Sequence, residues 1–473
     1  MTDEGNRPAV RVQHGDRYRP AEVAIALLLF YLPWANFPQP RFLRTVLLKV
    51  PTWGSGNETA WSLTPFLVPE TVLVFILGLS VLSARNRTLP PPASVLRPLV
   101  WASGLMLAGG LVSLAASQYP GISIGGIAGR CTVFVLAGVM AFSAPTPRVI
   151  KLWTYAALAG TALMCTAGLF YFFKDFGLPT SLSSLPGFRV SPAISEYQRA
   201  TYGFGSNTVD LLVLTAPTAM VLSIAASPGW RARAFLIAAA LLMYVNLLIS
   251  FERWAWACMG ASVLLTALYY RRQRRGLVIL GAAAVGALVL GPTAVSHFGG
   301  YFWQAVDPSS GSNVLGRVHA WGEGLRFLAA HPAGAGLGMA GTLAALSETS
   351  SHNLFIDIGV EGGVLALAGS LVWAAYHTSL LVRVITRRRA EDEWAFALLL
   401  GALMFVTFGI FFNSLLYFSG LMVWLAFWWC FPVMASAITG KAIRDHVSTS
   451  SPVVTDELAA LGRGAADART ARA

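Results

Sequence analysis

Long apolar segments, separated by short polar or charged stretches, dominate the pattern of this chain. We identify twelve of them, at 21–37, 64–84, 98–117, 121–143, 149–173, 206–227, 232–250, 254–270, 276–295, 352–382, 394–413 and 415–437. Their lengths are near or above the roughly 17–25 residues that a helix needs to cross a bilayer. Because backbone groups in lipid must be satisfied internally, each segment is expected to be helical. The pattern predicts an all-α polytopic membrane protein with about twelve transmembrane helices.

Composition supports this fold class, and the charge distribution predicts a topology. The chain is 55% hydrophobic and 12% charged, against about 25% charged in soluble proteins. With a cytoplasmic N-terminus, most of the 34 Lys and Arg residues fall on the cytoplasmic side, including the runs at 271–275 and 387–389. This is the positive-inside bias of a multi-pass membrane protein. The net charge of +12 is therefore assigned to topology, and no nucleic-acid partner is predicted.

The chain divides into one membrane domain with two tails. We expect a cytoplasmic tail at 1–19, a transmembrane domain at 20–438 and a disordered cytoplasmic tail at 439–473. The four cysteines all lie inside predicted spans without CxxC spacing, so neither a metal site nor a disulfide framework is predicted. No cofactor is predicted either.

The longest outer segment, 296–351 between spans 9 and 10, is predicted to be structured. Ser312 or Asn313 can cap a helix, and apolar residues then recur at helical spacing. This stripe consists of Val314, Val318, Trp321, Leu325 and Leu328. His331-Pro332 should end the helix. The stripe fits a helix that lies on the membrane surface or packs against the spans.

Arginines on the outer side are candidates for binding a diphosphate. Arg317 precedes Trp321 by four residues, so both lie on one side of the loop helix. Arg253 follows Glu252 at the outer end of a span. Guanidinium groups bind phosphate bidentately and stay charged. The alternative is that both are ordinary surface arginines, with Arg253 paired to Glu252.

Arg130 is charged and lies inside a predicted span. It is nine residues from the start of that span, roughly 13 Å deep at 1.5 Å per residue. Because a central charge costs at least about 2.5–3.5 kcal/mol, Arg130 should face the protein interior. An acidic partner, for which Glu70 is a candidate, and a bound anion both fit this position.

The pair His352-Asn353 stands where the long outer loop re-enters the membrane. Histidine can accept a proton near neutral pH, although a lone loop histidine often has no catalytic role. On a continuous helix Glu361 falls about 180° from His352 and Asp357 about 140°, so a direct His352–Glu361 pair is not expected unless Gly359, Gly362 or Gly363 distorts the helix. The group that orients His352 is therefore expected on another segment. Upstream, the glycines of 334–338 resemble a phosphate loop but follow no predicted strand, which favours a tight chain reversal or a close backbone approach.

Taken together, these segments resemble the O-antigen ligase and polymerase family of bacterial envelope glycosyltransferases. Four stretches carry the resemblance in order, and nearly all of it lies in the C-terminal two-thirds of the chain. They are Gly205-Ser206-Asn207; Ser250-Phe251-Glu252-Arg253, with an extra Phe-Glu between the family's Ser and Arg; Gly316-Arg317 to Trp321 followed by His331-Pro332-Ala333-Gly334-Ala335-Gly336-Leu337-Gly338; and Ser351-His352-Asn353-Leu354 followed by Glu361-Gly362-Gly363.

The resemblance implies a metal-independent, inverting glycosyltransferase. Its donor would be an undecaprenyl-diphosphate-linked glycan, and its acceptor a sugar hydroxyl on a lipid-anchored core or a glycan chain. Arg253 and Arg317 would hold the diphosphate, and His352 would deprotonate or orient the acceptor. Asn353, Trp321, Arg130 and Glu361 would support them. Ligase and polymerase both fit, because they share the donor and differ in the acceptor.

Three other functions stay open. Twelve spans are common in transporters and lipid-linked glycan flippases, but here most polar candidates lie in outer loops. A peptidoglycan-type polymerase should use an outer-loop carboxylate, and Asp307 is the only aspartate in the longest loop. A non-catalytic membrane scaffold would not depend on His352.

Overall fold

All regular structure in the described part of the chain is helical. The computed structural model describes residues 18, 20–35, 93–142, 146–176, 206–225, 228–250, 252–279, 281, 285, 314–337, 353–387, 392–411 and 422–438. The helices are α1 (Pro20–Ala35), α4 (Ala93–Ala116), α5 (Pro120–Phe142), α6 (Pro147–Phe176), α8 (Ser206–Ile224), α9 (Trp230–Ile249), α10 (Arg253–Tyr269), α12 (Val314–Ala330), α14 (Leu354–Arg387), α15 (Glu393–Phe411) and α16 (Met422–Trp429).

The all-helical membrane fold is confirmed within these residues. Six described helices are long and apolar enough to cross a membrane: Ser94–Ala116, Ser123–Ala141, Pro147–Phe170, Trp230–Leu248, Leu354–Arg387 and Glu393–Ile410. Shorter apolar helices cover Pro20–Phe30, Val209–Ile224 and Trp254–Tyr269. The predicted span at 64–84, most of that at 276–295, nearly all of the N-terminal tail and the whole C-terminal tail at 439–473 lie outside the described residues. The total of twelve spans therefore stays a prediction.

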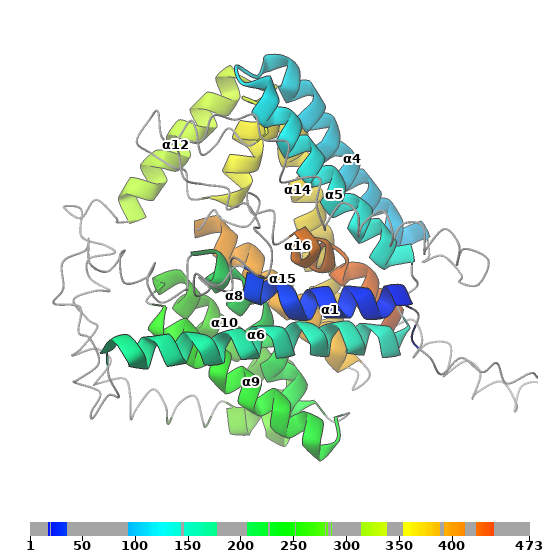
Figure 1. The fold of residues 1–473 in the computed structure, drawn as a ribbon, viewed down its shortest axis with the longest axis vertical. Helices are drawn as coiled ribbons and strands as arrows, with labels where there is room; N and C mark the ends of the chain where they lie inside the picture. Colours follow the sequence, from blue (N-terminus) through cyan, green and yellow to red (C-terminus); the bar gives the residue numbers. More distant parts are fainter. Residues whose placement is uncertain are drawn as a thin grey trace, which may run out of the picture.

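Two apolar cores hold the helices together. One draws mainly on α1, α4, α5, α14 and α16, and the other mainly on α8, α9, α10 and α15. Helix α6 contributes Trp153 to the first core and Met164 to the second, so it joins them. In Figure 1, α4, α5 and α12 form one end of the molecule, while α1, α6 and α9 cross the other.

Helices α4 and α14 pack closely because small residues line their contact. A side chain at Gly109 would collide with the Gly362 carbonyl, and one at Gly369 with the Ala102 carbonyl. Without a hydrophobic driving force in lipid, such close backbone approach is the main source of helix association. The contact gives the second half of α14 a fixed support.

The helix predicted in the long outer segment is present as α12, which ends at Ala330 before His331-Pro332. Its apolar stripe is only partly buried. Leu328 is 6% exposed, whereas Val318 and Leu325 are 49% and 52% exposed. Leu328 lies against Gly359 of α14, so the stripe packs against a span at this end of α12, while Val318 and Leu325 stay exposed.

Candidate functional site

The turn between α9 and α10 positions Arg253 at the first residue of α10. The Ser250 hydroxyl donates to the Leu247 carbonyl at 2.7 Å, and the Trp256 indole donates to the same carbonyl at 2.9 Å. The Ser250 bond is local to the end of α9, and the Trp256 bond holds that end against the start of α10. The side chain of Arg253 lies outside the described residues, so its predicted contact with a diphosphate and its alternative pairing with Glu252 both stay open.

Helix α12 carries two arginines in different settings. Arg317 lies near its start with a partly buried side chain, and Trp321, also partly buried, follows one turn later. Arg326, by contrast, is 70% exposed and pairs with Glu323 at 2.8 Å. Exposed pairs of this kind contribute roughly 0–1 kcal/mol. Arg317 is therefore the α12 arginine whose setting is compatible with a binding role.

Asn353 caps the start of α14. Its side-chain oxygen accepts hydrogen bonds from the backbone N–H groups of Phe355 at 3.0 Å and Ile356 at 3.1 Å. The residue is 7% exposed. A cap of this type satisfies helix donors that otherwise have no partner. Asn353 thus fixes where α14 begins, directly after His352, which itself lies outside the described residues.

Helix α14 is broken at Gly363, which adopts φ 72° and ψ −172°. The break frees the carbonyls of Val360 and Glu361 and the N–H of Val364 from their helical partners. The segment after α12 satisfies all three. Ala335 donates to the Val360 carbonyl at 2.8 Å, Gly336 donates to the Glu361 carbonyl at 3.0 Å, and Val364 donates to the Pro332 carbonyl at 2.9 Å.

We refer to residues 331–337, which make these bonds, as the glycine loop. Gly334 and Gly336 have φ of 83° and 108°, a region that glycine enters without steric cost. The Gly334 N–H donates to the His331 carbonyl at 2.8 Å, so the N–H groups of Gly334, Ala335 and Gly336 are all taken within the chain. This excludes a phosphate cradle in the described conformation. It confirms the expected chain reversal with close backbone approach.

The glycine loop is also held from its other side by the turn between α4 and α5. Leu337 is fully buried against Gly110 and Gly126. The Ser117 and Ser123 hydroxyls, 2.7 Å apart, lie against Gly336. The loop therefore lies between two helix pairs, and any added side chain at Gly336 would displace this serine pair.

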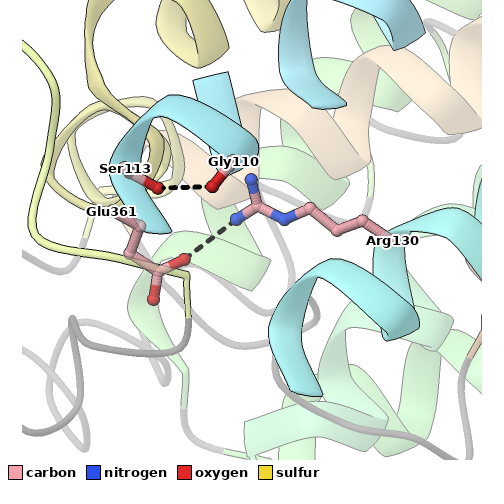
Figure 2. A network of polar contacts seen from close by, with 4 residues as sticks. All are labelled: Gly110, Ser113, Arg130 and Glu361. Atoms are coloured by element: carbon pink, nitrogen blue, oxygen red, sulfur yellow. Dashed lines mark hydrogen bonds and ion pairs between the residues drawn. The ribbon is translucent and has the colours of Figure 1, made fainter. Parts of the chain in front are cut away.

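An ion pair between Arg130 on α5 and Glu361 on α14 lies at this junction. Figure 2 shows the Arg130 side chain extending from α5 to the Glu361 carboxylate. The Nη2–Oε2 distance is 2.9 Å, and the side chains are only 9% and 1% exposed. Beside them, the Ser113 hydroxyl donates to the Gly110 carbonyl at 2.9 Å within α4. Among the described residues, Arg130 Nη1 is buried and has no hydrogen-bond partner.

This pairing was not predicted from the sequence, which offered Glu70 as the acidic partner of Arg130. Glu70 lies outside the described residues. The depth of each charged residue along its helix was a signal that could have identified this pair. Arg130 is ten residues from the start of α5, and Glu361 seven from the start of α14, which is about 15 Å and about 11 Å along helices expected to start at the same face. Two opposite charges at similar depth are natural partners.

The expected gathering of Arg253, Arg317 and His352 stays a prediction, because the Arg253 side chain and His352 lie outside the described residues. The structure does describe the helices and the loop that lie around these residues. Helix α12 continues directly into the glycine loop, and this loop is hydrogen-bonded to the first half of α14 at the break. The two helices also pack together through Leu328 and Gly359. The segments that carry Arg317 and Asn353 are thereby joined.

Comparison with known proteins identifies one similarity. Residues 238–371 match a family model described as O-Antigen ligase. No curated protein matches the chain. The matched part begins within α9, includes α10, α12 and the glycine loop, and ends within α14. It confirms the resemblance for this part of the chain.

Proposed function

We propose that this protein transfers a glycan from an undecaprenyl-diphosphate-linked donor to a sugar hydroxyl at the outer face of the inner membrane. One observation carries the proposal. The segment that matches the O-antigen ligase model, residues 238–371, contains the α9–α10 turn, α12, the glycine loop and the start of α14. Arg253, Arg317, His352 and Asn353 are all within it.

Arg253 and Arg317 would bind the departing diphosphate. In an inverting transfer without a metal, negative charge develops on the leaving group as the glycosidic bond breaks. Fixed positive groups aimed at that charge supply the largest catalytic effect. Guanidinium is suited to this because it stays charged and binds phosphate oxygens through two N–H groups.

His352 would accept the proton of the acceptor hydroxyl as the new glycosidic bond forms. The Asn353 cap supports this role, because it fixes the first turn of α14 immediately after the histidine. A base must be held within hydrogen-bond reach of the proton that it removes. The rigid start of α14 would serve that requirement.

The proposed location explains how the reaction is driven. With the N-terminus in the cytoplasm, these residues face the outside, where nucleotide sugars and ATP are absent. The energy must then come from a donor activated before it crosses the membrane. Apolar helices can hold its polyprenyl tail while arginines at the rim reach the diphosphate.

A transporter is the second candidate, because α14 is a broken helix with a buried ion pair beside the break. Transporters use such breaks to present backbone groups to ions and substrates. Here the Val360 and Glu361 carbonyls and the Val364 N–H are taken by the glycine loop. This arrangement favours a structural role for the break over ion coordination.

Deletion of the gene, followed by analysis of surface glycans, tests the proposal. Loss of long chains with accumulation of the lipid-linked repeat would indicate a polymerase. Long chains retained on the carrier lipid would indicate a ligase. Unchanged surface glycans and no accumulated lipid-linked glycan would contradict the proposed function.

A further inference from the structure

The Arg130–Glu361 pair is not explained by stability. Moving two charges out of water costs about as much as their mutual attraction returns, so buried pairs can often be replaced by uncharged residues without loss of stability. A single hydrogen bond joins the two side chains, and the buried Nη1 of Arg130 has no partner among the described residues. A different contribution, such as fixing one arrangement of packed elements, is the better-attested use of such groups.

The position of the pair indicates which elements it fixes. Glu361 accepts the Gly336 N–H with its backbone carbonyl while its carboxylate accepts Arg130. A single residue therefore joins three parts of the chain: α5 through the ion pair, α12 through the glycine loop, and α14 through its own backbone.

We propose that Arg130 and Glu361 are positioning residues, whose ion pair locks α5 and the glycine loop onto the break in α14. The lock sets where α12, with Arg317, stands relative to the start of α14, with Asn353 and His352. The catalytic part of this inference rests on the proposed function. Neither residue needs to touch substrate, because each acts through the segments that it holds.

Such a lock matters because the two groups that it positions have different tasks. Arg317 would bind the donor diphosphate and His352 the acceptor hydroxyl. Their separation decides whether the reacting atoms meet in line. A displacement of about 1 Å can slow an enzyme by about a hundredfold. Loosening the lock should therefore slow transfer far more than it weakens donor binding.

The informative variant is the double substitution R130M/E361Q. A single substitution would leave one charge buried without its partner, which destabilises the fold. The double variant removes both charges and keeps side chains of similar size. Its matched control is R275M/E393Q, which makes the same two replacements in the 3.1 Å ion pair between the segment after α10 and the start of α15. That pair involves none of the candidate site residues.

The first readout is kinetic. With the lipid-linked glycan extracted from the deletion strain as donor, R130M/E361Q should transfer at least about tenfold more slowly at saturation. Its KM for the donor should stay within about twofold of the wild-type value, because lost orientation lowers the rate without lowering affinity. The same protein should remain monodisperse and keep its melting temperature. The control should match the wild type in all of these measurements.

The second readout is a distance that needs no substrate. Spin labels at L325C on α12 and L371C on α14 occupy side chains that are 52% and 50% exposed. Only Cys131 among the native cysteines is not buried, so C131A provides a suitable background. Electron paramagnetic resonance should give a narrow distance distribution for the wild type and the control, and a broader or shifted one for R130M/E361Q.

Two results would overturn the lock. In the first, R130M/E361Q keeps the wild-type distance distribution and the wild-type rate. In the second, it is slow although the distribution is unchanged, which would show that Arg130 acts on the substrate itself. A wild-type protein that transfers no glycan would count against the proposed function alone, because the distance measurement would still test the lock. The milder R130K, which keeps the charge but loses the planar fork, should fall between the wild type and the double variant.

Discussion

Among the described residues, two ion pairs each join distant parts of the chain through a buried glutamate, and they differ in the exposure of the arginine and in the elements around them. Arg130 and Glu361 are 9% and 1% exposed and lie beside a broken helix. In the pair of Arg275 and Glu393, the arginine is 39% exposed, and it lies just after the end of α10. The first pair is enclosed where three elements meet, whereas the second is exposed on its arginine side and has a buried glutamate, 4% exposed.

This difference indicates different roles: the exposed pair fits a role in membrane topology, and the enclosed pair fits a role in function. Arg275 belongs to a basic run that is expected to hold its span in the membrane with the positive side inside, and such a role tolerates an exposed, weakly contributing pair. The junction around the glycine loop instead keeps a broken helix, glycines with positive φ and a buried charge pair. Features of that kind concentrate where function requires them.

The largest effect is expected from removing charge near this junction. Arg317→Ala should lower glycan transfer by roughly 10²–10³-fold, because one lost group that stabilises developing charge has about that effect. Arg326→Ala is the matched control, since Arg326 lies on the same helix and is exposed and paired with Glu323. It should transfer within about twofold of the wild type. Equal losses in both variants, measured at equal membrane levels, would contradict the diphosphate assignment.

A substitution that disturbs the backbone conformation at the break in α14 should have the next largest effect. Gly363→Ala places a side chain at φ 72°, against the Pro332 carbonyl. Backbone strain of this kind costs about 1–3 kcal/mol, and the contact adds to it. Thermal unfolding in detergent should show a clearly lowered melting temperature. Gly260→Ala on α10, where nothing lies within 4 Å, should leave it unchanged or raise it, and an unaffected Gly363→Ala would refute the broken helix.

A smaller effect is expected at the start of α14. Asn353→Ala removes the cap and should cost about 1 kcal/mol of stability, with a slower transfer because the first turn frays beside His352. Asn353→Asp keeps a capping oxygen and should retain most of the stability and most of the transfer rate. If transfer by Asn353→Asp were as poor as that of Asn353→Ala, the amide would be acting on a sugar and not mainly as a cap.

The smallest effect is expected at the other pair. R275M/E393Q, which removes both charges, should change the melting temperature little, because a pair whose arginine is 39% exposed contributes at most about 1 kcal/mol after screening by solvent. Glycan transfer should stay within about twofold of the wild type. A loss of glycan transfer as large as that expected for R130M/E361Q would contradict the proposed difference between the two ion pairs.

The sequence predicted what depends on local patterns. Apolar length predicted helices in every described span, and helical spacing with the His331-Pro332 stop predicted α12 with nearly its observed bounds. The glycines at 334 and 336 were rightly interpreted as a chain reversal. Each of these inferences needs only the residues of one segment, because propensity, spacing and backbone freedom are local properties.

What could not be predicted depends on how segments meet. The glycines of α14 left a distortion of this helix open. The break at Gly363 is stable because a loop distant in sequence satisfies the freed backbone groups, so the sequence of α14 alone did not show that the break forms. The partner of Arg130 depends on which helix lies beside α5, and Glu70 was as reasonable as Glu361. The stripe of α12 fitted both a helix on the membrane surface and a helix packed against the spans, because spacing does not show how far a helix overlaps its neighbour.

The most direct test is a transfer assay with the purified protein in liposomes. The donor is the lipid-linked glycan extracted from the deletion strain, and the acceptor is the glycolipid fraction of the same strain. We expect undecaprenyl diphosphate to be released as glycan appears on the acceptor fraction, and we expect Arg317→Ala to stop both while Arg326→Ala does not. If the donor stays intact, or only moves across the bilayer, the protein is not a glycosyltransferase.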